Sequence, residues 1–101
     1  MPNIIVVVRY TAQPGKASEG LSALRELVGT VLAKESPCAG IDILQDLDRP
    51  ESITLIERWP DPASFLGPHM QQPHIQAFMQ SAGAYFTGPP EISFHSVVGD
   101  A

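Results

Sequence analysis

NIIVVVRYT, residues 3–11, is the segment that most narrows the choice of fold. Its five consecutive β-branched residues favour a β-strand, because branched side chains pack well on a pleated surface. Successive residues of a strand point to opposite faces, and here both faces are largely apolar. The pattern is typical of a central strand covered on both sides. One face holds Ile4, Val6, Val8 and Tyr10, and the other holds Ile5, Val7 and Arg9.

An amphipathic helix is predicted after the break at Pro14-Gly15. Ser18 is a candidate cap, and Pro37 stops the helix. The apolar residues recur at three- and four-residue steps, which places them on one stripe. These residues are Leu21, Leu24, Leu27, Val28, Val31 and Leu32.

Two strands are predicted over residues 40–47 and 52–59, joined by a turn at 48–51. Proline-containing starts after Asp61 and Gln72 predict two short helices, which are the halves of one helical segment broken at Gly67-Pro68. A last strand is predicted over residues 91–98, so the order is β-α-β-β-α-β. This order is typical of the α+β ferredoxin-like fold, an antiparallel sheet with both helices on one face.

The chain of 101 residues is expected to form one domain over residues 1–101. Helices on one face would leave the second apolar face of residues 3–11 bare, and we expect another copy of the chain to cover it. A homodimer is therefore predicted.

The net charge of −5 and the scattered basic residues argue against nucleic acid or an anionic membrane surface as a partner. No apolar run approaches the length of a membrane span or a signal peptide. The single cysteine, Cys38, excludes an intramolecular disulfide and is expected to be a small, partly buried residue. A cytoplasmic location is the resulting expectation.

Potentially reactive side chains are densest between Glu57 and His74, beside the break between the short helices. A small-ligand pocket is expected there, between the sheet and the broken helix. His74, in the first turn of a helix, is the first choice for acid–base chemistry, and the alternative is a partly exposed ring bonded to backbone or to Glu57. His69 and Trp59 each allow a structural role or a place in the site.

Glu57, if buried, needs a partner such as a histidine or a tyrosine. The predicted substrate-binding residues are Glu57, Tyr10, Val8, Phe65, Phe78 and Met79. His69 and His74 are five residues apart with a proline between them, so a metal site is not expected. His95 stands alone on the last strand, and no motif marks a flavin, nicotinamide or nucleotide cofactor.

Three motifs together resemble the antibiotic biosynthesis monooxygenase domain family, of the dimeric α+β barrel superfamily. They are Val6-Val7-Val8-Arg9-Tyr10 followed by Pro14-Gly15-Lys16; Leu55-Ile56-Glu57-Arg58-Trp59 followed by a short helix; and His69 with Pro73-His74-Ile75-Gln76-Ala77-Phe78. The resemblance extends from Ile4 to about Val97. It implies a dimer whose sheets pack face to face into a barrel.

The same resemblance implies oxidation of a small phenolic, quinol or other aromatic substrate by O₂ without a cofactor. His74 would be the base, Trp59 would hold the substrate or oxygen, and His69 and Glu57 would assist. A haem-degrading sister group also has a tryptophan like Trp59, but its asparagine and histidine positions are Val8 and Met79 here. A dimer that binds a small molecule without catalysis is the alternative function.

Overall fold

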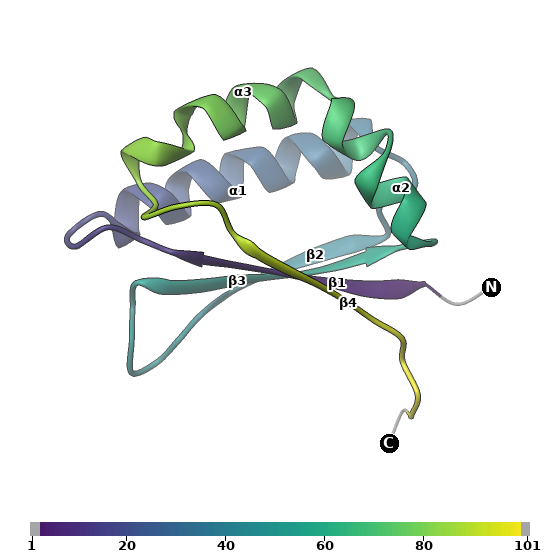
Figure 1. The fold of residues 1–101 in the computed structure, drawn as a ribbon, viewed down its shortest axis with the longest axis horizontal. Helices are drawn as coiled ribbons and strands as arrows, with labels where there is room; N and C mark the ends of the chain where they lie inside the picture. Colours follow the sequence, from purple (N-terminus) through teal and green to yellow (C-terminus); the bar gives the residue numbers. More distant parts are fainter. Residues whose placement is uncertain (1–2, 100–101) are drawn as a thin grey trace.

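The computed structural model describes residues 3–99, and within them four strands and three α-helices form two layers (Figure 1). No helix in this range is long and apolar enough to cross a lipid bilayer. In chain order the elements are β1 (Ile4–Thr11), α1 (Ala17–Lys34), β2 (Gly40–Gln45), β3 (Ser52–Trp59), α2 (Pro62–Leu66), the 3-10 helix η1 (His69–Gln71), α3 (Pro73–Ser81), the 3-10 helix η2 (Ala82–Ala84) and β4 (Glu91–His95).

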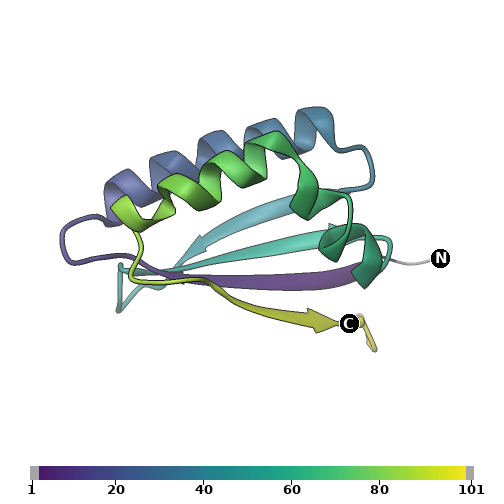
Figure 2. The ribbon, with the colours of Figure 1, turned by 45° about the horizontal axis from the view of Figure 1, so that its top comes forward.

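The sheet has the strand order β2-β3-β1-β4, and every neighbouring pair is antiparallel. β1 is central, as its two apolar faces predict, with Val8 opposite Leu55 of β3 and Ile92 of β4. Both long helices, α1 and α3, lie over the same face of the sheet (Figures 1 and 2). The predicted ferredoxin-like α+β fold is confirmed.

Several element ends differ from the prediction. α1 begins at Ala17 with Lys16 at the N-cap position and no side-chain cap, so the prediction of Ser18 as the cap is wrong. β2 ends at Gln45, two residues early, because the Asp46 carboxylate accepts backbone N–H groups of the next residues and turns the chain. β4 likewise ends at His95 rather than at residue 98.

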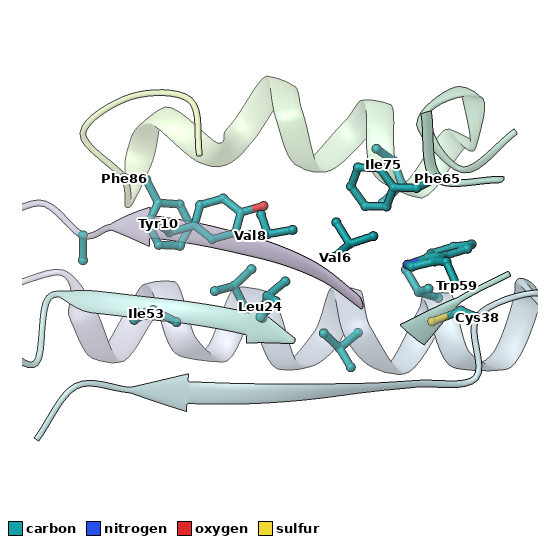
Figure 3. Packing of buried hydrophobic residues seen from close by; sticks show 14 residues of the cluster. Val6, Val8, Tyr10, Leu24, Cys38, Ile53, Trp59, Phe65, Ile75 and Phe86 are labelled. Atoms are coloured by element: carbon teal, nitrogen blue, oxygen red, sulfur yellow. The ribbon is translucent and has the colours of Figure 1, made fainter. Parts of the chain in front are cut away.

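The core lies between the inner face of the sheet and the helices (Figure 3). Trp59 and Phe65 pack edge to face at one end of it, and Tyr10 and Phe86 pack at the other. α1 buries Leu24, whereas Leu32, also assigned to its buried stripe, is 46% exposed and does not belong to the core. The remaining buried residues of α1 are Gly20, Val28 and Val31.

The outer face of the sheet carries no helix (Figure 1). Its centre is apolar and half-buried, formed by Ile5 and Val7 of β1 beside Ile56 of β3. Polar groups surround this centre, including an ion pair at 3.3 Å between the exposed side chains of Arg58 and Asp42. The bare second face expected from the sequence is therefore present in the single chain.

Candidate functional site

A cavity of about 540 Å³ lies between the inner face of the sheet and the helices α1 and α3. Its wall is mostly aliphatic and aromatic. Among the described side chains that line it, only Tyr10, Glu57 and His69 carry an O–H, carboxyl or ring N–H group. A cavity of this size and character suits a small apolar ligand that is oriented by a few polar contacts.

Glu35, the residue that follows α1, joins two histidines behind the cavity wall. Its side chain is only 5% exposed. His69 Nδ1 lies 2.8 Å from one carboxylate oxygen, and His74 Nε2 lies 2.6 Å from the other. Both are short, charge-assisted geometries, so the carboxylate is hydrogen-bonded on each side despite its burial.

His69 reaches this position because η1 turns the chain between α2 and α3. Its ring is buried and packs against the indole of Trp59, at a centroid distance of 4.6 Å, and against Phe65 at 4.8 Å. Burial lowers the pKa of His69, although the Glu35 carboxylate opposes that change. A neutral ring donating from Nδ1 to Glu35 leaves Nε2 as the nitrogen that accepts a proton or hydrogen bond, in a residue that lines the cavity.

Glu57 points from β3 to the inner side of the sheet and is also buried. The indole N–H of Trp59 donates a hydrogen bond of 2.9 Å to its carboxylate. Burial raises the pKa of Glu57 to about 7, with the Trp59 bond opposing and the nearby Glu35 charge adding to the change. Near neutral pH this acid is therefore present in both protonation states.

Seven of the nine residues predicted for the site line the cavity. They are His69, Glu57, Tyr10, Val8, Phe65, Phe78 and Met79. Trp59 is only 1% exposed and lies in the core beside His69 and Glu57, outside the cavity lining. His74 lines a smaller hollow of about 300 Å³ between α1 and α3, and Glu35 separates it from His69.

The partners expected for Glu57 and His74 differ from those observed. Glu57 is hydrogen-bonded by Trp59 rather than by a histidine or tyrosine, because the indole lies two residues along the same strand face. His74 bonds to Glu35 instead of Glu57 or backbone. Glu35 was missed as a site residue, although it continues the buried α1 spacing of Leu24, Val28 and Val31 by one four-residue step.

No cluster of three or more His, Cys, Asp or Glu side chains suited to a metal ion occurs within residues 3–99. Cys38 is buried, its thiol directed at the Gly40 carbonyl oxygen at 3.7 Å, and burial raises its pKa, so it lacks the character of a reactive thiolate. Burial also raises the pKa of Tyr10, which keeps the phenol protonated as a hydrogen-bond donor to the cavity.

Solved structures with the same fold come from several organisms. A conserved protein of Methanosarcina mazei is 27% identical, with 95% of this chain and 93% of that one aligned at a TM-score of 0.82. A Pseudomonas aeruginosa protein is 25% identical over 98% of this chain and 97% of its own, with a TM-score of 0.84. A Bordetella bronchiseptica protein, provisionally named an antibiotic biosynthesis monooxygenase, is 17% identical over 98% of this chain and all of its own, with a TM-score of 0.88 that shows the shared fold alone.

The sequence itself supplies the assignment to a family. No curated protein matches the chain significantly. The sequence profile described as antibiotic biosynthesis monooxygenase matches residues 3–81, which is well over half of the chain and includes Glu35, Glu57, Trp59, His69 and His74. The chain belongs to the antibiotic biosynthesis monooxygenase family.

Proposed function

We propose that the protein oxidises a small phenol, quinol or related hydroxyarene with O₂ and without a bound cofactor. The observation that supports this most directly is the Glu35–His69 pair at the edge of an aromatic-lined cavity of about 540 Å³. An imidazole held by a carboxylate is an effective general base, because the carboxylate stabilises the imidazolium that forms. The apolar wall accommodates the rings of such a substrate and excludes water from its anion.

Base catalysis is sufficient to start this chemistry on an electron-rich substrate. The substrate O–H bond breaks as its proton moves to His69, and the resulting anion transfers electrons to O₂. For a quinol, one oxygen atom enters the ring to give a hydroxyquinone and the other leaves as water. The ring supplies all four electrons, so the reaction balances without an external reductant.

His69 replaces His74 as the base in this proposal, because only His69 lines the cavity. Glu57 is suited to return a proton to the reduced oxygen, since its raised pKa of about 7 keeps part of it protonated at neutral pH. Trp59 contacts both residues from the core, so its proposed role is to hold them rather than to hold substrate or oxygen.

The test is oxygen uptake by the purified protein with hydroquinone, naphthohydroquinone and anthrone, corrected for autoxidation. We expect uptake with at least one of them and a loss of about 100-fold or more in His69→Asn, whose amide nitrogen takes the place of Nδ1 toward Glu35 but which has no base. Glu51→Gln, at an exposed position of the hairpin between β2 and β3, is the control and should retain the rate. Absence of protein-dependent uptake across the panel would refute the proposal.

A second candidate is binding of a small aromatic molecule without turnover, which the small number of polar groups on the cavity wall favours. Thermal denaturation with each compound, followed by its recovery and mass analysis, separates the two functions. A compound that raises the melting temperature and is recovered unchanged under air supports binding alone.

We also propose that two copies associate through the outer faces of their sheets, which would give a dimeric α+β barrel. The half-buried Ile5, Val7 and Ile56 at the centre of that face support this arrangement, since an apolar patch with a polar surround is typical of an interface. A cytoplasmic location, expected from the lone cysteine, stays a prediction.

A further inference from the structure

The Glu35 carboxylate lies between two histidines that belong to different regions of the molecule. His69 faces the large cavity, whereas His74, whose side chain is 14% exposed, lines the smaller hollow between α1 and α3. Glu35 lines neither space. It therefore has no direct access to a ligand, and any effect that it has on one passes through the rings.

The geometry restricts the protonation of His69. A neutral imidazole can carry its hydrogen on either nitrogen, but an ionised carboxylate only accepts hydrogen bonds. With Glu35 as an ionised acceptor 2.8 Å away, Nδ1 carries the hydrogen of the neutral ring, and Nε2 is left with its lone pair. A base that serves the cavity needs this tautomer, because the opposite one would present an N–H to the substrate hydroxyl.

His74 occupies the second oxygen of the same carboxylate at 2.6 Å. With both oxygens bonded, the carboxyl group has a single orientation relative to His69. The two bonds also connect the end of α1 to η1 and to the first turn of α3, so the segment that carries His69 is held against the helix.

We propose that Glu35 is the positioning residue of the site, that it holds His69 in the Nδ1–H tautomer with Nε2 free as the base, and that His74 secures Glu35 rather than acting on substrate. The part that concerns catalysis rests on the proposed function. The tautomer of His69 in the ligand-free protein does not, so the two can fail separately.

The first test uses histidine labelled with ¹⁵N and long-range proton–nitrogen correlation spectra of the full chain at neutral pH, with His69→Gln to assign the signals. We expect a protonated Nδ1 and a bare Nε2 for His69 in the wild type. Glu35→Met removes the acceptor at similar side-chain length, and His69 should then show exchange between tautomers. Glu19→Met, an exposed carboxylate of the same helix, should leave the His69 signals unchanged.

A wild-type His69 that is protonated at Nε2, or on both nitrogens, would overturn the proposal even if no Glu35 variant folds. Unchanged His69 signals in a folded Glu35→Met protein would overturn it as well.

The second test measures oxygen uptake with whichever quinol the wild type oxidises. Because Glu35 does not line the cavity, Glu35→Met should lower kcat about 100-fold and leave KM nearly unchanged. A raised KM with wild-type kcat would assign Glu35 to binding and contradict the positioning role. If the wild type consumes no oxygen, the proposed function fails while the spectra still decide the tautomer.

Discussion

Glu57 and His69 border one apolar cavity. Burial raises the pKa of Glu57 and lowers the pKa of His69. Burial disfavours the charged form of each group, so the carboxyl holds its proton longer and the imidazole loses its proton sooner. The consequence is that an acid and a base are available in the same space near neutral pH. Such a pair of environments is typical of acid–base sites.

Replacing Glu57 by Gln should change how stability depends on pH. The folded pKa of about 7 exceeds the ordinary value of 4.5, so between these limits the folded state binds more protons than the unfolded chain. The contribution of this group to the free energy of unfolding is therefore fully present below about pH 4.5 and is lost as the pH rises through 7. We expect Glu57→Gln to be more stable than the wild type near pH 8, by up to about 3 kcal/mol.

The measurement is urea denaturation followed by circular dichroism near pH 5 and near pH 8. The lowered pKa of His69 acts oppositely, raising stability as the pH rises through its range, so only the difference between variant and wild type at each pH isolates Glu57. Glu51→Gln, an exposed residue of the hairpin, is the control and should show no difference at either pH. A wild type more stable than Glu57→Gln at the higher pH would contradict the expectation.

For single residues of the site, the sequence predicted the residue types better than their hydrogen-bond partners. Glu57, His69 and Tyr10 could be found because they flank a helix break or lie on the inner parity of a strand. Glu35 is more than thirty residues from either histidine, and only the packing of η1 and α3 against α1 brings them together. A carboxylate on a buried helical stripe is nevertheless a usable signal, since such a charge needs a partner.

α1 shows how the apolar period of a helix relates to its burial. Leu24 faces the sheet and is fully buried, whereas Leu32 lies on the flank of the same stripe and is 46% exposed. The stripe predicted from spacing alone is wider than the surface that the sheet covers. Spacing shows which residues share a side of the helix, and the neighbouring elements decide how much of that side is enclosed.

Leu24→Ala should lower the free energy of unfolding by about 3 kcal/mol, because it removes buried apolar atoms and leaves a void that the sheet fills poorly. Leu32→Ala makes the same chemical change on the same helix and should alter stability by about 0.5 kcal/mol or less. Equilibrium urea denaturation at one pH measures both. Equal losses in the two variants would show that the burial of α1 differs from the arrangement described.

Most elements could be predicted from the sequence, because hydrophobic period and proline placement are local signals. The start of α2 is the clearest case, since a helix was expected directly after Asp61, and the Asp61 carboxylate caps α2 by accepting the Ser64 backbone N–H at 2.8 Å. η1 was not expected, because Gly67-Pro68 marks a break without indicating the conformation that follows. The early end of β2 depends on a side-chain turn at Asp46 that strand propensity does not reveal.

For the molecule as a whole, the two faces of the sheet differ in what covers them. The inner face is enclosed by α1 and α3, while the outer face is bare and apolar at its centre (Figures 1 and 2). A chain of this length buries a limited share of its surface, so association would add to a modest core. The two-sided apolar pattern of β1 made this bare face predictable from the sequence.

Light scattering at micromolar concentration should give about twice the chain mass of 10.9 kDa. Ile56→Glu, which places a charge at the centre of the outer face, should shift the mass to that of one chain. Leu47→Glu makes the same kind of change at a hairpin position that is 99% exposed, and it should leave the mass unaltered. A wild-type mass near that of one chain would rule out the dimer.

The position of Trp59 makes the site accessible to fluorescence measurements. It is the chain's one tryptophan, and its buried indole contacts the His69 ring and bonds to Glu57. Its fluorescence is therefore a built-in optical reporter: protonation of the imidazole should quench the emission, and a change in the Glu57 bond should shift its wavelength. An unlabelled sample could thus reveal ligand entry and proton movement at the two neighbouring groups in real time, by stopped-flow mixing.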